Sequence, residues 1–152
     1  MFDSQATKGN GRFMFHSMDA TIGRKTKKLW LFAGTGDMNN LVDKRTSVNN
    51  ILLGIADKDF PKYKNPVPTG NPPQPPTIKN LLSNCVNTAN QVSPNCIDIT
   101  TAGQFGKIGW YIELEDAKKV TAEPTVAGGV VYFPVYKPPA DLCDLGLSLI
   151  HI

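Results

Sequence analysis

The sequence has few of the residues from which metal and catalytic sites are usually built. Three cysteines occur in 152 residues. None belongs to a Cys-x-x-Cys pair or to a Cys/His cluster, so zinc and thioredoxin-type chemistry have no support. The two histidines are His16 and His151, and no motif supplies either with triad partners. We therefore expect a chain that is not an enzyme, with His16 as a structural residue of a strand.

Long apolar runs and strong charge are also missing. No stretch reaches the roughly 18 to 20 apolar residues that cross a bilayer, and no signal-peptide pattern stands at the N-terminus. The net charge is only +3, with basic residues clustered at Arg24, Lys25, Lys27 and Lys28. Aromatic residues do not interleave with this cluster. It is interpreted as a solvated turn, and nucleic acid is not expected as a partner.

What is abundant is glycine and proline. The chain has 13 Gly and 12 Pro together with 41% hydrophobic residues. This composition is too apolar for disorder and too rich in turn residues for a helical bundle. It predicts an all-β chain of short strands, forming one domain or part of one.

Three short apolar runs occupy the N-terminal third. Residues 12–17 (RFMFHS) and 28–33 (KLWLFA) flank a polar segment and are predicted to pair as a hairpin. Residues 51–56 (ILLGIA) form a third run, which Asp57 and Asp59 end. The three runs predict an antiparallel meander.

The middle of the chain changes character. Residues 61–76 (PKYKNPVPTGNPPQPP) lack periodicity, and their prolines cannot join a sheet interior, so a surface insertion or linker is predicted. Residues 78–86 (IKNLLSNCV) have apolar residues at helical spacing behind Thr77, a good N-cap. One short helix is expected there.

The C-terminal third begins with a strongly β-prone run at residues 108–114 (IGWYIEL). Its alternate residues Trp110, Ile112 and Leu114 are predicted to face one side. Residues 115–119 then predict a charged turn.

Two further strands follow this turn. Residues 120–126 contain Pro124, which suits the outer or entering position of a strand. Gly128 and Gly129 predict a tight hairpin turn into residues 130–136 (VVYFPVY), because primed turns need the positive φ that glycine tolerates.

Cysteine spacing leaves two alternatives open. Cys85 and Cys96 could close a small disulfide loop in an oxidising compartment, which would leave Cys143 to pair outside this sequence. Three unpaired thiols in a reducing cytosol are the other interpretation.

Two other patterns could indicate a phosphate-binding loop or an acid/base pair. Gly34-Thr35-Gly36 lacks the third glycine of a dinucleotide fingerprint and the Gly-Lys-Ser/Thr of a P-loop, so a tight turn after a strand is predicted. Glu113 and Glu115 lie on one face of a strand, where paired carboxylates could do acid/base work. A solvated strand face is the preferred interpretation.

Four segments, in this order, resemble the C-terminal β-propeller of the PilC/PilY-type pilus proteins. They are residues 29–37 (LWLFAGTGD), 54–57 (GIAD), 109–114 (GWYIEL) and 121–138 (TAEPTVAGGVVYFPVYKP), with Cys143 following. The resemblance implies a partial β-propeller of quinoprotein-like blades. The residues that it implies as structural are Gly34, Thr35, Gly36, Gly109, Trp110, Tyr111, Pro124, Gly128 and Gly129.

The resemblance also implies a function. Members of this family are pilus-biogenesis factors and tip adhesins, so the expected partners are pilins, minor pilins and host or surface ligands. The expected location is the periplasm, outer membrane or cell surface at the pilus. The alternatives are a fragment of a pyrroloquinoline-quinone-dependent dehydrogenase propeller and an outer-membrane assembly scaffold of the same repeat type.

The resemblance also bears on calcium binding and on the two ends of the sequence. Some family members carry a calcium loop, and calcium is therefore possible in a full-length parent. Here Asp57 and Asp59 are only weak metal candidates, because Phe60 and Pro61 stand where the next ligand and a glycine should be. Residues 1–146 are interpreted as an incomplete propeller without a cofactor. Residues 147–152 (LSLIHI) resemble translated sequencing adapter and are expected to be a non-native tail.

Overall fold

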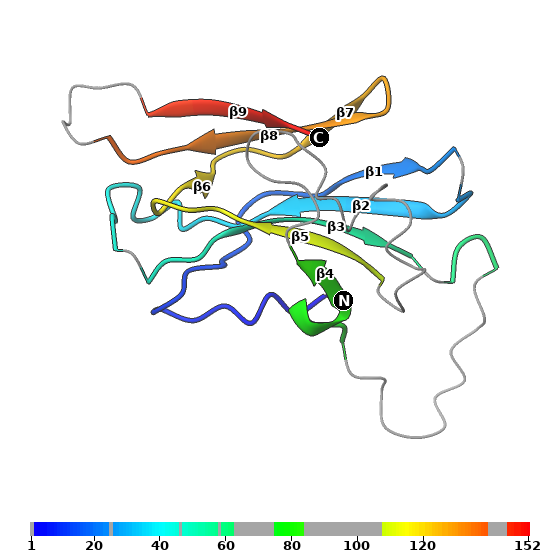
Figure 1. Cartoon of the computed structure of the whole chain (residues 1–152), viewed down its shortest axis with the longest axis horizontal. Helices are drawn as coiled ribbons and strands as arrows, with labels where there is room; N and C mark the ends of the chain where they lie inside the picture. The colour runs from blue at the N-terminus through cyan, green and yellow to red at the C-terminus, as the bar shows by residue number, and fades with distance from the viewer. Residues whose placement is uncertain are drawn as a thin grey trace.

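The computed structural model describes residues 2–24, 26–45, 47–57, 59–62, 75–83, 108–139 and 146–152. Within these residues the protein is all-β, as predicted, with two sheets stacked one above the other (Figure 1). Neither sheet closes into a ring or barrel. The helical content of the same residues is a single 3₁₀ turn, η1 (Ile78–Asn80). None of their helices is long and apolar enough to cross a membrane.

The first sheet, which we call sheet one, has the strand order β1-β2-β3-β5-β4. Its antiparallel β2-β3 pairing confirms the second half of the predicted meander, and β3 covers the predicted run. Strand β5 pairs antiparallel with β3, whereas β4 pairs parallel with β5. The strands are β1 (Asp19–Ile22), β2 (Leu29–Gly34), β3 (Ile51–Ala56), β4 (Leu81–Ser83) and β5 (Gly109–Glu113).

The first strand of the hairpin lies elsewhere than predicted, at β1 rather than at residues 12–17. Arg12 has φ +65°, outside the β region, and the Phe13 carbonyl accepts a hydrogen bond from Gly36 N at 2.8 Å. The position next to β2 is taken by β1, because Gly23 N donates to the Lys28 carbonyl (2.9 Å) and sets the register of the hairpin.

The helix predicted at residues 78–86 is also wrong where the structure describes it. After the 3₁₀ turn, the chain extends as β4 alongside Gly109–Tyr111 of β5. Leu81 is buried by this pairing, so the sheet outweighs the local helical spacing. Residues 84–86 lie outside the described residues, as do Cys85, Cys96, Cys143 and residues 63–74 of the Pro-rich segment.

The second sheet, sheet two, is built around β8 (Val130–Tyr136). Strands β6 (Lys119–Val120) and β7 (Thr125–Ala127) form one interrupted strand along one edge of β8, and β9 (Leu147–His151) runs along the other. Gly128 and Gly129 have φ +60° and +87° and make the predicted turn between β7 and β8. The predicted tail begins at the first residue of β9, and its non-native origin stays a prediction.

The main core lies between the sheets. Trp110, Ile112 and Leu114 are buried on one side, as the alternation predicted, and belong to one cluster with Phe133 and Val135 of β8. A second cluster covers the opposite face of sheet one and contains Ile51, Leu53, Ile55 and Leu81, with Phe2 and Ile78 packed against it.

Candidate functional site

The Gly34-Thr35-Gly36 segment lies at the end of β2, where sheet one meets sheet two. Val120 N of β6 donates to the Thr35 carbonyl at 3.0 Å. A Cβ atom on Gly34 would overlap the Val120 side chain, and one on Gly36 would lie 2.8 Å from the Val120 carbonyl oxygen. Glycine is therefore needed at both positions, because the Val120 side chain lies against Gly34 and the Val120 backbone lies against Gly36.

The amides that a phosphate-binding loop would use are already occupied. Thr35 N donates to the Ile51 carbonyl at 2.9 Å, and Gly36 N donates to the Phe13 carbonyl at 2.8 Å. A phosphate loop needs such amides free and pointing at the ligand. The segment therefore acts as a junction between strands.

Asn50 completes this junction from the start of β3. Its side chain is fully buried, and its Oδ1 accepts hydrogen bonds from Arg12 N (3.1 Å) and Thr35 Oγ1 (3.2 Å). Its Nδ2 donates to the Lys118 carbonyl at 2.8 Å. Asn50 thus ties together three segments far apart in sequence. We call the whole set the seam: Gly34, Thr35, Gly36, Asn50, Lys119 and Val120.

Lys119 is the charged member of the seam and is only 1% exposed. Its Nζ donates to the main-chain carbonyls of Asp43 (2.8 Å) and Ala117 (3.2 Å). Burial lowers the pKa of Lys119. A lysine with a lowered pKa can act as a base or nucleophile, but such a group must reach a substrate. Enclosed and bound by two carbonyls, Lys119 instead holds the loop that contains Asp43.

Asp43 is fixed in turn by an ion pair. Arg45 Nη2 lies 2.6 Å from Asp43 Oδ2, and the Asp43 side chain is 10% exposed. The hydrogen bond from Arg45 is the largest cause that lowers the pKa of Asp43, to about 2. Arg45 Nη2 also donates to the Lys8 carbonyl at 3.4 Å, so the N-terminal segment joins the same cluster.

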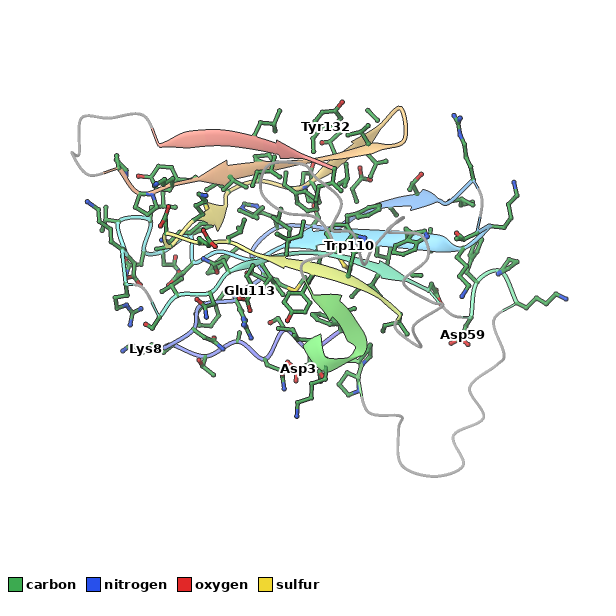
Figure 2. The ribbon with its side chains drawn as sticks, in the orientation of Figure 1. Asp3, Lys8, Asp59, Trp110, Glu113 and Tyr132 are labelled. Carbon is green, nitrogen blue, oxygen red and sulfur yellow. The ribbon has the colours of Figure 1, made fainter. Side chains whose placement is uncertain are left out.

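The predicted carboxylate candidates lie apart. Asp57 and Asp59 follow β3, where Asp59 N donates to Asp57 Oδ1 at 2.9 Å in a local turn. Glu113 (Figure 2) faces Ile51 at the other end of β3. Its Oε1 lies 3.7 Å from Arg12 Nη2. Among the residues that the structure describes, no three His, Cys, Asp or Glu side chains form a potential metal site.

Trp110 and Tyr111, the aromatic residues that the resemblance implies as structural, pack inside the molecule. Trp110 is fully buried between the sheets (Figure 2), and its ring centroid lies 6.2 Å from that of Phe32. A Cβ atom on Gly54 would lie 2.6 Å from Trp110 Cε2, so the indole lies directly over Gly54. Tyr111 packs on the opposite face. Buried between sheets, Trp110 cannot stack a sugar or peptide.

The remaining residues singled out from the sequence lie in turns or in segments outside the strands. Pro124 lies immediately before β7, and among the described residues no atom beyond the adjacent chain neighbours comes within 4 Å of a Cβ built on Gly128 or Gly129. His16 lies in the segment before β1, and its buried Nε2 has no hydrogen-bond partner among the described residues. His16 is therefore not in a strand, contrary to the sequence-based prediction.

Sequence reasoning missed Asn50, Lys119 and the Asp43–Arg45 pair. A polar residue before an apolar run gives the same pattern whether it is exposed or buried, so sequence held no signal for Asn50. The chain matches no protein-family model, no curated protein and no solved structure at a significant level.

Proposed function

We propose that this chain is a non-catalytic structural and adhesive part of a type IV pilus assembly and tip-associated protein. The proposal is supported by the ordered resemblance of four segments to the PilC/PilY-type propeller. Three of these segments contain β2, β5 and the β7–β8 hairpin, which carry much of the buried core. In this proposal each open sheet belongs to a quinoprotein-like blade, and the chain passes from one to the other at the turn of residues 115–118.

The structural observation that supports the non-catalytic part of the proposal is the seam. Gly34-Thr35-Gly36 is the motif most open to interpretation as a nucleotide loop, and its amides and space are taken by the chain itself. A stack of sheets whose loops are exposed suits assembly and attachment, since binding surfaces of such folds lie on loops. The partners would be pilins, minor pilins and surface ligands, at the periplasm, outer membrane or cell surface.

The test is deletion of the gene that encodes this chain. We expect loss of surface pili and of attachment, both restored by the wild-type gene and by a Gly128→Ala gene, because Gly128 lies on an open turn. A Gly34→Val gene should fail to restore them, with protein levels followed by immunoblot. Normal piliation and attachment after deletion, or retention of the gene product in the cytoplasm, would contradict the proposal.

A further inference from the structure

The residues that the structure describes cover the face of sheet one that points away from sheet two over only part of its width. Trp30 and Phe32 of β2 point into the core between the sheets, so Leu29 and Leu31 point to the opposite face. Ile22 pairs with Leu29, and Ala20 pairs with Leu31. We call these four residues the hairpin patch: Ala20, Ile22, Leu29 and Leu31.

The hairpin patch is accessible and apolar. Ile22 is 54% exposed, Ala20 is exposed, and the two leucines are half-buried. Leu31 pairs with Ile55, which belongs to the cluster covered by Phe2 and Ile78. Among the described residues, the patch is therefore the uncovered continuation of the surface that Phe2 and Ile78 cover at β3. A sheet with apolar residues on both faces is normally covered on both.

Cations border the patch on the turn that joins β1 and β2. Arg24, Lys27 and Lys28 are exposed, and none of them forms an ion pair with another described residue. Nearby carboxylates are already engaged: Asp19 Oδ2 accepts from Val126 N (2.6 Å), and Asp57 Oδ1 accepts from Asp59 N (2.9 Å). The rim of the patch thus presents three cations with which no carboxylate of the described residues pairs directly.

We propose that the hairpin patch and these three cations form a docking surface for a protein segment with apolar side chains bordered by carboxylates. A flat face with half-buried leucines suits a strand or sheet laid against it, at about the 10 Å spacing of packed sheets. An anionic membrane fits less well. Ile22 is the one large side chain of the patch exposed by more than half, which is too little to insert. The inference uses the patch and its charges alone and does not depend on the pilus assignment.

The test measures binding of two synthetic β-hairpin peptides to the 152-residue chain by fluorescence anisotropy. Both peptides carry Val and Leu on one face, and one has two glutamates beside its turn where the other has two lysines. We expect the glutamate peptide to bind at least about tenfold more tightly at low salt, with the difference reduced at high salt. Ile22→Ser should weaken its binding, whereas Val42→Ser, at an exposed valine of another loop, should not.

Reversing the charges beside the patch gives a more specific test of the same binding. Arg24→Glu combined with Lys28→Glu should transfer the preference to the lysine peptide, and unchanged circular dichroism and melting would show that the fold is retained. Equal binding of both peptides, or binding of neither, would overturn the proposal. So would equal binding to anionic phospholipid vesicles, or a self-association of the chain that Ile22→Ser abolishes.

Discussion

The two ends of strand β2 differ in burial. At its C-terminal end, the backbones of β2, β3 and β6 meet in the seam, and the buried polar groups of Thr35, Asn50 and Lys119 all have hydrogen-bond partners. At its start, the β1–β2 turn carries exposed cations and the apolar Ile22. The difference teaches that one strand can anchor the fold at one end and offer surface for binding at the other.

The comparison has a physical basis. Where two backbones approach closely, side chains are excluded and every polar group must be satisfied internally, since an unpaired buried group costs about 1 to 3 kcal/mol. At an exposed turn, water satisfies the same groups, and substitutions usually change stability by less than about 0.5 kcal/mol. Substitutions should therefore have their largest effects in the seam and the smallest at the turn.

The largest effect is expected from Gly34→Ala. Its methyl group would overlap the Val120 side chain, and overpacking of this severity should cost about 3 kcal/mol of unfolding free energy. The matched control is Gly128→Ala, at φ +60° in open space, which should cost only about 1 kcal/mol from its backbone conformation. Urea unfolding measures both, and equal losses would contradict the close approach of β6 to β2.

The next effect is expected from Asn50→Ala. The substitution removes the partner of Arg12 N and of the Lys118 carbonyl, and should cost about 2 to 3 kcal/mol. Asn40→Ala, at an exposed asparagine of the neighbouring loop, should change stability by less than about 0.5 kcal/mol. Chemical denaturation of both variants measures the two losses of unfolding free energy. A loss for Asn50→Ala as small as that for Asn40→Ala would contradict the idea that the seam anchors the fold.

A smaller, pH-dependent effect is expected from Asp43→Asn. Folding lowers the pKa of Asp43 from 3.8 to about 2, so the ionised carboxylate stabilises the fold above its unfolded pKa. This stabilisation is lost as the pH falls from about 4 through 2. Allowing for solvent screening, the variant should be less stable by about 1 kcal/mol near neutral pH and equal to the wild type below pH 2.

The control for Asp43 is Asp116→Asn, which removes an exposed ion pair with Lys137 and should have a smaller effect. Unfolding curves measured across the acid range follow both differences. A stability difference for Asp43→Asn that does not change with pH would show that the ion pair with Arg45 is not its source.

The smallest effect is expected from Ile22→Ser at the open end. Because more than half of this side chain is exposed, the unfolding free energy should change by about 0.5 kcal/mol or less. Thermal unfolding measures it. A loss as large as that of Asn50→Ala would show that the hairpin end supports the fold as much as the seam does.

The sequence predicted the parts of the fold in which pattern and packing agree. The runs of β3, β5 and β8 combine β-branched or aromatic residues with burial, and Gly128-Gly129 determines its turn locally. Two local patterns gave wrong predictions. Residues 12–17 look more strand-like than the DATI of β1, yet the turn between Gly23 and Lys28 places β1 beside β2.

The helical spacing of residues 78–86 failed for a related reason. Parallel pairing with β5 gives Leu81 a buried position that local sequence does not encode. The seam could not be foreseen either, because it depends on residues 12, 35, 50 and 118 meeting after the sheets have formed. The glycines of Gly34-Thr35-Gly36 predict a tight turn, but they do not predict which strand lies against it.

The most direct test of the seam is amide hydrogen exchange followed residue by residue. Val120 N donates to the Thr35 carbonyl across the two sheets, whereas the Ile22 amide points away from β2 on the edge strand β1. We predict that the Val120 amide exchanges only through global unfolding and that the Ile22 amide exchanges orders of magnitude faster. Exchange of Val120 as fast as that of Ile22 would contradict the account that the seam joins the two sheets.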